Sequence, residues 1–142
     1  MPDPDASYIS VTPEAGRAFM RRDLQGPVTM LNLLRFREVA DYSATPDLRP
    51  DAPISGAEAY DRYMEHTMPF LAAAGSELTF VGDGGHVVIG PPGERWDRVL
   101  LVRHASLDAF MQFATNAEYL AGAGHRTAAL ADSRLLPLVE TR

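Results

Sequence analysis

The stretch "VTMLNLLRF" (residues 28–36) predicts a β-strand whose two faces are both apolar. Side chains alternate between the faces of a strand, so one face would carry Val28, Met30, Asn32, Leu34 and Phe36. The other face would carry Thr29, Leu31, Leu33 and Arg35. The stretch "WDRVLLVRH" (residues 96–104) is apolar on both sides as well. Because apolar faces are stable when they are covered, we expect both sides of both strands to be covered.

Helical segments with clear start signals lie around these strands. A capped segment with Pro at its first helical position predicts a short helix within residues 12–26. A capping box, "SGAE", begins a longer helix with an apolar stripe over residues 55–74. A capped short helix is expected at residues 106–113, and a second capping box, Thr115–Glu118, begins a last helix that continues to Leu130.

Two further segments complete the set of strands. Residues 77–90 are strand-like on both sides of the glycine cluster Gly82–Gly85, which fits either a hairpin turn or one long strand with a bulge. The stretch "SRLLPLVE" (residues 133–140) is a strand in which Pro137 favours an edge position.

The resulting order, β-α-β-β-α-β, is typical of the ferredoxin-like α+β fold, in which helices cover one face of an antiparallel sheet. We expect one domain over residues 1–142, with an N-terminal extension and short helix at 1–26 and the core at 27–142. The open face of such a sheet normally alternates polar residues, and here it does not. A second copy of the chain is the expected cover. The interface candidates are Arg35, Leu101 and Arg103. An arginine on a buried sheet face needs a carboxylate, so the two arginines either form ion pairs at the interface or one of them binds an anionic substrate.

Composition narrows the class of protein. A net charge of −6 disfavours nucleic-acid and anionic-membrane partners, and no apolar run has the length of a membrane span. The chain lacks cysteine, and all thirteen of its basic residues other than histidine are arginine, which excludes thiolate and Schiff-base chemistry. The four histidines show no metal-ligand spacing. We expect a cytoplasmic protein without a metal or cofactor.

Five residues are candidates for the lining of a pocket between sheet and helices: Asn32, Tyr63, His66, Trp96 and Arg126. A buried amide such as Asn32 bonds either to backbone and water or to a ligand carbonyl. Tyr63 is either a core residue or forms a pair with His66 that binds a phenol or moves a proton.

The stretch "NAEYLAGAGHRTAAL" (residues 116–130) carries two glycines that weaken a helix by about 1 kcal/mol each. Close packing against a neighbouring element would explain them. The helical phase places Arg126 at the buried margin, as an anchor for a carboxylate or helix carbonyls or as a pocket residue. It turns His125 outward to solvent.

Together with "GPVTMLNLLRFRE", "SGAEAYDRYMEHTMPFL", "VGDGGHVVIG", "WDRVLLVRHAS" and "ADSRLLPL", this stretch resembles the DUF1330 family of dimeric α/β-barrel proteins, from about Pro27 onward. The resemblance implies a ferredoxin-like monomer that pairs sheet to sheet into a homodimer, and it implies no reaction.

Three functional hypotheses follow. The first is a homodimer that binds a small molecule, or a cofactor-independent enzyme acting on one. The second is an enzyme like the haem- or quinol-type monooxygenases, because some dimeric α/β barrels use Asn, Trp and His together. The third is a non-catalytic scaffold. Residues 41–53, rich in Pro, Asp, Ser and Thr, are expected to form a mobile loop, a lid or a binding loop.

Overall fold

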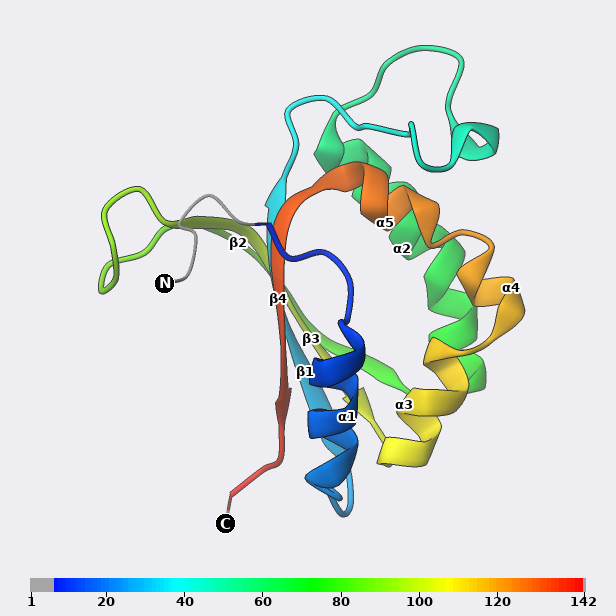
Figure 1. The fold of residues 1–142 in the computed structure, drawn as a ribbon, viewed down its shortest axis with the longest axis vertical. Coiled ribbons are helices and arrows are strands. Elements are labelled where there is room, and N and C mark those ends of the chain that lie inside the picture. Colours follow the sequence, from blue (N-terminus) through cyan, green and yellow to red (C-terminus); the bar gives the residue numbers. More distant parts are fainter. Residues whose placement is uncertain (1–6, 142) are drawn as a thin grey trace.

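A computed structural model describes residues 7–141 and shows a four-stranded antiparallel sheet in the order β2-β3-β1-β4. The strands are β1 (Val28–Phe36), β2 (Glu77–His86), β3 (Arg95–His104) and β4 (Leu130–Leu138). The helices α1 (Pro13–Arg21), α2 (Gly56–Ala73), α3 (Leu107–Ala114), α4 (Ala117–Leu120) and α5 (Gly124–Ala129) lie on one side of the sheet (Figure 1). A short 3-10 helix, η1 (Pro46–Leu48), lies in the loop before α2. The ferredoxin-like α+β fold predicted from the order of elements is therefore confirmed.

The two apolar strands are neighbours in the middle of the sheet. In the antiparallel register Leu31 lies opposite Leu101, and Asn32 lies opposite Leu100. Val28, Met30 and Leu34 on the helix-facing side of β1 are buried, as the alternation predicts. The strand β4 occupies an edge, which satisfies the requirement of Pro137 for a position without a second ladder partner.

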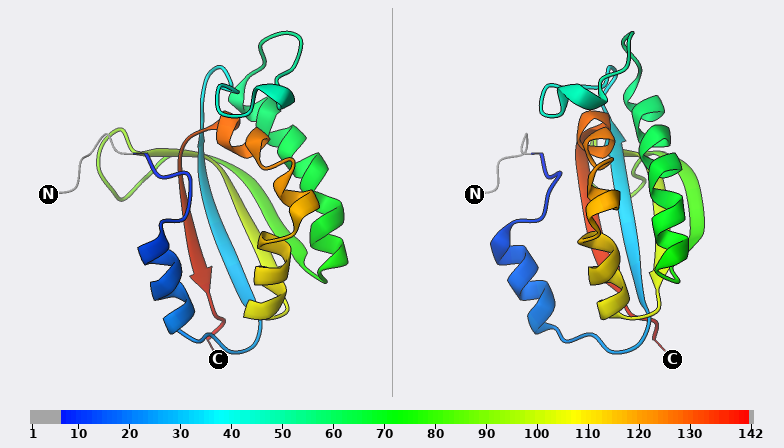
Figure 2. Two further views of the ribbon diagram at one scale, coloured as in Figure 1. Left: turned by 45° about the vertical axis from the view of Figure 1, so that its right-hand side comes forward. Right: turned by 90° about the vertical axis from the view of Figure 1, so that its right-hand side faces the viewer.

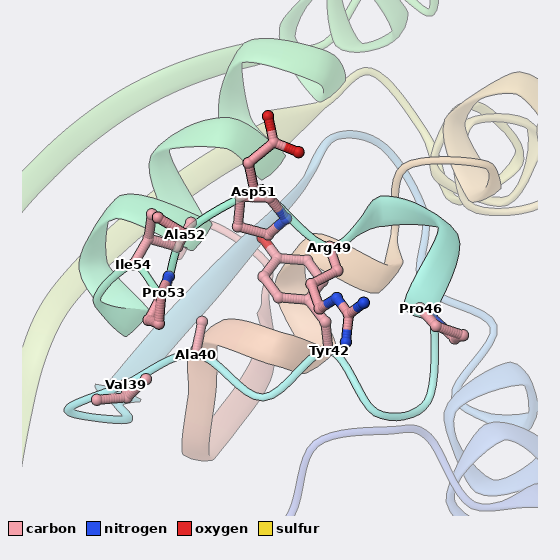
Figure 3. Close-up of a pocket in the computed structure, with 10 residues that line it drawn as sticks. Val39, Ala40, Tyr42, Pro46, Arg49, Asp51, Ala52, Pro53 and Ile54 are labelled. Atoms are coloured by element: carbon pink, nitrogen blue, oxygen red, sulfur yellow. The ribbon is translucent and has the colours of Figure 1, made fainter.

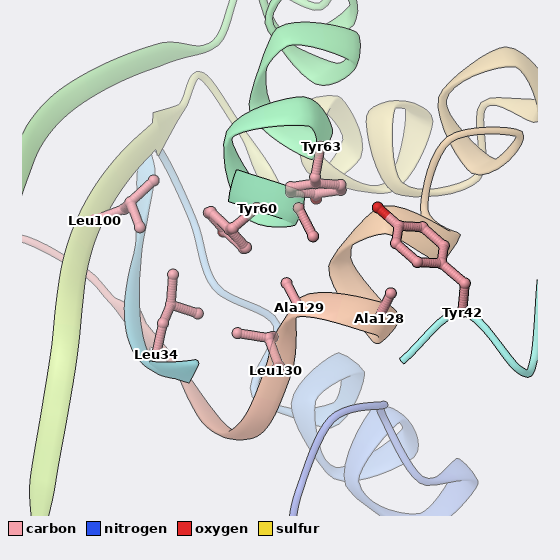
Figure 4. Packing of buried hydrophobic residues seen from close by; sticks show 9 residues of the cluster. Leu34, Tyr42, Tyr60, Tyr63, Leu100, Ala128, Ala129 and Leu130 are labelled. Carbon is pink, nitrogen blue, oxygen red and sulfur yellow. The ribbon is translucent and has the colours of Figure 1, made fainter. Parts of the chain in front are cut away.

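The main core lies where α2 and α5 cross the sheet. Leu34 from β1 and Leu100 from β3 pack with Tyr60 and Tyr63 from α2, and Leu130 closes the cluster from the start of β4 (Figure 4). All five side chains are at most 7% exposed. Burying each such side chain contributes about 1.5–3 kcal/mol, so this cluster fixes α2 and α5 against the sheet.

The structure of α2 contains the N-terminal cap, the exposed proline and the terminating glycine that its sequence predicts. The Ser55 hydroxyl accepts a hydrogen bond from the Glu58 amide at 3.0 Å and caps the first turn. Pro69 lies on the exposed side of the helix, where the carbonyl that loses its helical donor is accessible to solvent. Gly75 follows the helix with a φ of +73°, the left-handed conformation that ends helices.

The glycine cluster of residues 82–85 belongs to one long strand rather than to a hairpin turn. β2 runs through it to His86, and the register shift lies earlier, between Leu78 and Phe80. A β-carbon at Gly84 would overlap the Trp96 carbonyl oxygen, which explains a glycine there. The chain turns at residues 87–94, in a loop that projects away from the helices (Figure 1).

The last predicted helix is two short helices joined by a turn, and this corrects two expectations. The cap is Asn116, whose side chain accepts from the amides of Glu118 and Tyr119. The Thr115 hydroxyl instead donates to the Met111 carbonyl and closes α3. β4 begins at Leu130, directly after α5, because the break at residues 121–123 turns α5 toward the sheet.

The loop of residues 41–53 is anchored more firmly than its composition predicts. Tyr42 is only 5% exposed and belongs to the main core, and Leu48 packs against the same cluster. A β-carbon at Gly124 would overlap the side chains of Thr45 and Leu48, so α5 and the loop are in close contact.

The face of the sheet turned away from the helices is apolar. Leu31, Leu33, Val99 and Leu101 form its centre and are only partly buried, and Leu136 is 50% exposed. No helix among residues 7–141 combines the length and the apolar character that crossing a bilayer requires.

Candidate functional site

A cavity of about 940 Å³ lies between the sheet and the helices. Its floor is the helix-facing side of β1, β3 and β4, and its walls come from α2, α3, α4, α5 and the N-terminal segment that contains α1. Small-molecule sites usually have volumes of about 300–1,000 Å³ and mostly apolar walls with a few polar groups. The cavity fits this description in size and in lining.

The N-terminal segment forms one wall of the cavity. Along α1, Ala15, Ala18 and Phe19 face the cavity, at the i, i+3, i+4 spacing of one helix face. The Phe19 ring meets the Phe110 ring of α3 edge-on, with 6.0 Å between centroids. No residue of α1 is fully buried, and the helix stands beside β4, apart from the other helices (Figure 2).

Arg126 ties this segment to the body of the protein. Its guanidinium donates to the Ile9 carbonyl at 2.6 Å and to the Ser133 hydroxyl at 3.4 Å. The Tyr8 amide donates to the Asp132 carboxylate at 2.8 Å, next to Ser133 on β4. Arg126 therefore anchors a backbone carbonyl, as expected, but one from the N-terminal segment rather than from a helix end.

Arg134 forms a second contact to the same segment. Its guanidinium lies 4.9 Å from the ring centre of Tyr8 and 5.1 Å from that of Trp96, and it donates to Asp132 at 2.8 Å. Hydrogen bonds from Tyr8, Ser133 and Arg134 hold the pKa of the Asp132 carboxyl below its usual value, against the effect of burial, which raises it.

Three tyrosines lie along one side of the cavity. The hydroxyls of Tyr63 and Tyr119 share a hydrogen bond of 2.6 Å. Burial raises the pKa of Tyr60 to about 12, and burial together with the Tyr119 hydroxyl raises the pKa of Tyr63 well above its usual value. The positive charge of Arg126 acts in the opposite direction on both pKa values. The hydroxyls of Tyr60 and Tyr63 are therefore neutral hydrogen-bonding groups at neutral pH.

His104 lines the cavity next to α3. Its Nδ1 shares a hydrogen bond of 2.7 Å with the Ser76 hydroxyl, and its ring packs against Phe110 and Phe113. Burial lowers the pKa of this imidazole to about 4, so the ring is uncharged at neutral pH.

Two further polar groups line the cavity and have at most one hydrogen-bond partner in the described part of the chain. The Asn32 amide makes one long hydrogen bond, 3.3 Å to the Met30 carbonyl. The Thr67 hydroxyl is buried and has no hydrogen-bond partner among the described residues.

The structure brings three of the five predicted pocket residues together, because Asn32, Tyr63 and Arg126 all line the cavity. His66 and Trp96 are not among the described lining residues. The Nε2 of His66 donates to the carbonyls of Glu118 at 2.9 Å and Tyr119 at 3.1 Å. Of the two alternatives for Tyr63, the structure therefore shows the core residue with a satisfied hydroxyl and not the pair with His66.

The interface candidates lie as the strand alternation predicts. Leu101 is partly buried at the centre of the open face, and Arg103 is exposed opposite Glu77 on β2. Arg35 is partly buried opposite Asp132 on β4. Among residues 7–141 neither arginine forms an ion pair within the chain.

The expectation that His125 is solvated is also wrong. Its Nδ1 shares a hydrogen bond of 2.7 Å with the hydroxyl of the buried Tyr42. The turn between α4 and α5 changes the helical phase and so directs His125 toward Tyr42. Burial and the charge of Arg62 lower the pKa of His125. Tyr42 also borders a smaller hollow of about 520 Å³ in the loop of residues 39–54 (Figure 3).

Several residues that line the cavity were not predicted from the sequence. The apolar face of α1 carried a signal, the spacing of Ala15, Ala18 and Phe19, but nothing local tells where an N-terminal helix docks. His104 and Thr67 sit in apolar patterns that give no sign of a cavity nearby. Within residues 7–141, no group of His, Asp and Glu is arranged to hold a metal ion.

Comparisons with known proteins find no matching protein-family model and no matching curated protein. Two crystal structures are similar over almost the whole chain. The methylated RPA0582 protein matches with a TM-score of 0.85 and 34% identity, covering 96% of each chain. The RPA0582 protein of unknown function from Rhodopseudomonas palustris matches with a TM-score of 0.85 and 32% identity, covering 96% of this chain and 99% of the other. The solution structure of a hypothetical Arabidopsis thaliana protein, At3g17210, has a TM-score of 0.50 and 13% identity, covering 83% of this chain and 91% of that chain, and it shows the fold alone.

Proposed function

Because this chain belongs to the family of the RPA0582 protein of Rhodopseudomonas palustris, a protein of unknown function, we propose a function from the cavity itself. The protein is a cytoplasmic homodimer that binds a small organic molecule between the helix-facing side of its sheet and its helices. The cavity of about 940 Å³ is the observation that carries this proposal. The space is open to solvent on one side, and a concave, mostly apolar surface of this size is typical of a small-molecule site.

The lining supports binding more than scaffolding. A scaffold has no use for a concave apolar surface that stays in contact with water, because burying that surface would be favourable. Here apolar walls surround a few polar groups from separate elements, including Asn32 on β1, Tyr60 on α2 and Arg126 on α5. Polar groups of this kind fix the orientation of a bound molecule.

A reaction on the bound molecule is part of the same proposal. The uncharged imidazole of His104 and the hydrogen-bonded pair of Tyr63 and Tyr119 would orient a substrate through hydrogen bonds, since the shifted pKa values of His104 and Tyr63 do not suit proton transfer at neutral pH. The monooxygenase-like alternative has less support, because Trp96 packs against Arg134 and does not meet Asn32 in the cavity.

The homodimer is supported by the open face of the sheet. Its central side chains, Leu31, Leu33, Val99 and Leu101, form a contiguous apolar surface with Leu136 beside them. An exposed apolar surface of this extent is typical of an interface. The assignment to the DUF1330 family belongs to the proposal too, and it rests on the strand and helix motifs of the sequence.

Native mass spectrometry of the purified protein tests the proposal, because it reports subunit number and retained small molecules together. Ala123→Phe places a large ring at a lining position, and Ala121→Phe places the same ring at an exposed, non-lining position three residues from Gly124. We expect a retained or added apolar ligand to be lost from Ala123→Phe and kept by Ala121→Phe. Equal binding by both variants would show that the ligand sits elsewhere.

A further inference from the structure

We infer that the cavity takes an organic anion, a molecule with an apolar body and one carboxylate or equivalent negative group, and that Arg126 receives the negative group. This inference deepens the proposed function and rests on it. It assigns a class of ligand and a role to one residue.

The charges around the cavity are of one sign. Three arginines, Arg22, Arg126 and Arg134, line it, and no Asp or Glu is among the described lining residues. The whole chain has a net charge of −6, so this local excess of positive charge runs against the overall composition. A cavity lined by one sign of charge within low-dielectric walls concentrates ligands of the opposite charge.

Arg126 is the best placed of the three arginines. Arg134 is already paired with Asp132, and Arg22 is exposed. Arg126 is partly buried and forms no ion pair within residues 7–141. Its two acceptors, the Ile9 carbonyl and the Ser133 hydroxyl, are both neutral. A guanidinium has five N–H donors, so it retains capacity to bind a carboxylate.

The strand register places a second polar group near Arg126. Leu135 on β4 lies opposite Asn32 on β1, and Ser133 is two residues further along the same face of β4. Diagonal neighbours of this kind lie about 7–8 Å apart. The Arg126 guanidinium, which contacts Ser133, is therefore on the same part of the cavity floor as the weakly bonded Asn32 amide. The guanidinium and the amide together form a polar end for an anion, while the Ser133 hydroxyl donates to the Tyr8 carbonyl and positions the guanidinium as its acceptor.

The rest of the cavity suits an apolar body. Phe110, Phe113 and the ring of Tyr60 face it, with Met30 and Leu100 on its floor. Burial keeps the imidazole of His104 uncharged at neutral pH, so it does not compete with Arg126 as a cation for the anion. The expected ligands are aromatic or aliphatic acids.

The competing interpretation is that Arg126 only fastens the N-terminal segment through Ile9. In that case its loss lowers stability and weakens all ligands of one shape equally. In the proposed role its loss removes the preference for charge. Ligands that share one shape and differ in charge therefore separate the two roles.

The experiment measures binding of 4-phenylbutyrate, 4-phenylbutanamide and 4-phenylbutylamine, and of their naphthyl analogues, by calorimetry at pH 7.5. In the native protein we expect the acid to bind about tenfold or more tightly than the amide, and the amine to bind weakest. Arg126→Met should bring acid and amide to about equal affinity, and Arg126→Lys should keep part of the difference because it keeps the charge. Arg17→Gln, which removes an exposed arginine of α1 outside the lining, should leave the difference unchanged.

The possible results separate the two proposals. Equal binding of acid and amide by the native protein, or an undiminished preference in Arg126→Met, would overturn the anion assignment while leaving a binding cavity. Absence of binding by all six compounds would overturn the proposed function and this inference with it.

Discussion

Gly122 lies against the imidazole ring of His66, so closely that a β-carbon at residue 122 would overlap the ring. The ring cannot move away freely, because its Nε2 donates to the carbonyls of Glu118 and Tyr119. The glycine thus lets the turn between α4 and α5 approach α2. This is the close packing that the unusual glycines of residues 116–130 predict, and it assigns His66 a structural contact outside the cavity.

Gly122→Ala should therefore destabilise the protein. Overpacking at such a contact costs about 1–3 kcal/mol, and the cost should appear as a lower midpoint of urea unfolding. Adding His66→Ala should recover part of the loss, since the ring that opposes the new methyl group is then gone. Gly16→Ala is the control, because Gly16 is helical and has only an ordinary contact with Val11. It should be neutral or stabilising by up to about 1 kcal/mol. A loss in Gly16→Ala as large as in Gly122→Ala would contradict this explanation.

Local signals were sufficient for most of the fold. The alternation in β1 gave bounds that match the structure, and the cap at Ser55 and the stop at Gly75 gave those of α2, because each signal acts within a few residues. The break between α4 and α5 was missed. It depends on contacts of Gly122 with His66 and of Gly124 with Thr45, which join segments far apart in the sequence.

The site was harder to predict for the same reason. Asn32, Tyr63 and Arg126 were found because a polar or aromatic residue interrupts an apolar stripe at the right face. The pairing of Tyr63 with Tyr119 rather than His66 depends on how α4 sits on α2. The docking of α1 depends on Arg126, which lies 117 residues from its acceptor Ile9.

Tyr42 and His125 should be energetically coupled. Their hydrogen bond of 2.7 Å joins the loop before α2 to α5, and Tyr42 is almost completely buried. In a double-mutant cycle, Tyr42→Phe and His125→Ala should show a coupling of about 0.5–1.5 kcal/mol. Chemical unfolding of the four proteins measures it. Additive effects of the two changes would mean that the hydrogen bond contributes nothing to stability.

Leu101→Asp should dissociate or unfold the proposed homodimer. Leu101 lies at the centre of the open face opposite Leu31, and a carboxylate there would be buried without a partner on association. Met68→Asp adds the same charge to the exposed side of α2 and should leave the mass of the dimer in solution unchanged. Light scattering at micromolar concentration distinguishes the species. A native protein that is monomeric under these conditions would overturn the sheet-to-sheet dimer.

Thr67→Val should stabilise the ligand-free protein. The Thr67 hydroxyl is buried without a hydrogen-bond partner, and replacing it by a methyl group of similar shape removes a desolvation cost. We expect a gain of about 0.5–1 kcal/mol in the free energy of unfolding. Thr115→Val is the control, because that exposed hydroxyl has a partner in the Met111 carbonyl, and it should not stabilise. A loss of stability in Thr67→Val would indicate a partner for the hydroxyl, such as an ordered water molecule.

The free energy of unfolding should decrease as the pH is lowered, over a pH window set by His104. Its pKa in the folded protein is about 4, against 6.5 for the free side chain, because burial disfavours the charged ring. Between these values the unfolded chain binds more protons than the folded one, so the free energy of unfolding decreases as pH falls from about 6.5 and levels off below about 4 for this group. The total contribution is on the order of 3 kcal/mol.

His104→Asn isolates this contribution, since its amide keeps a polar atom near the Ser76 hydroxyl and does not titrate in this range. The difference between native and variant unfolding midpoints should shrink or reverse in favour of the variant as pH falls from 7 to 4.5. Parallel pH profiles for the native protein and His104→Asn would contradict this explanation. They would mean that protonation of the imidazole does not lower the stability of the folded protein, because water reaches the ring directly or after a movement of α3.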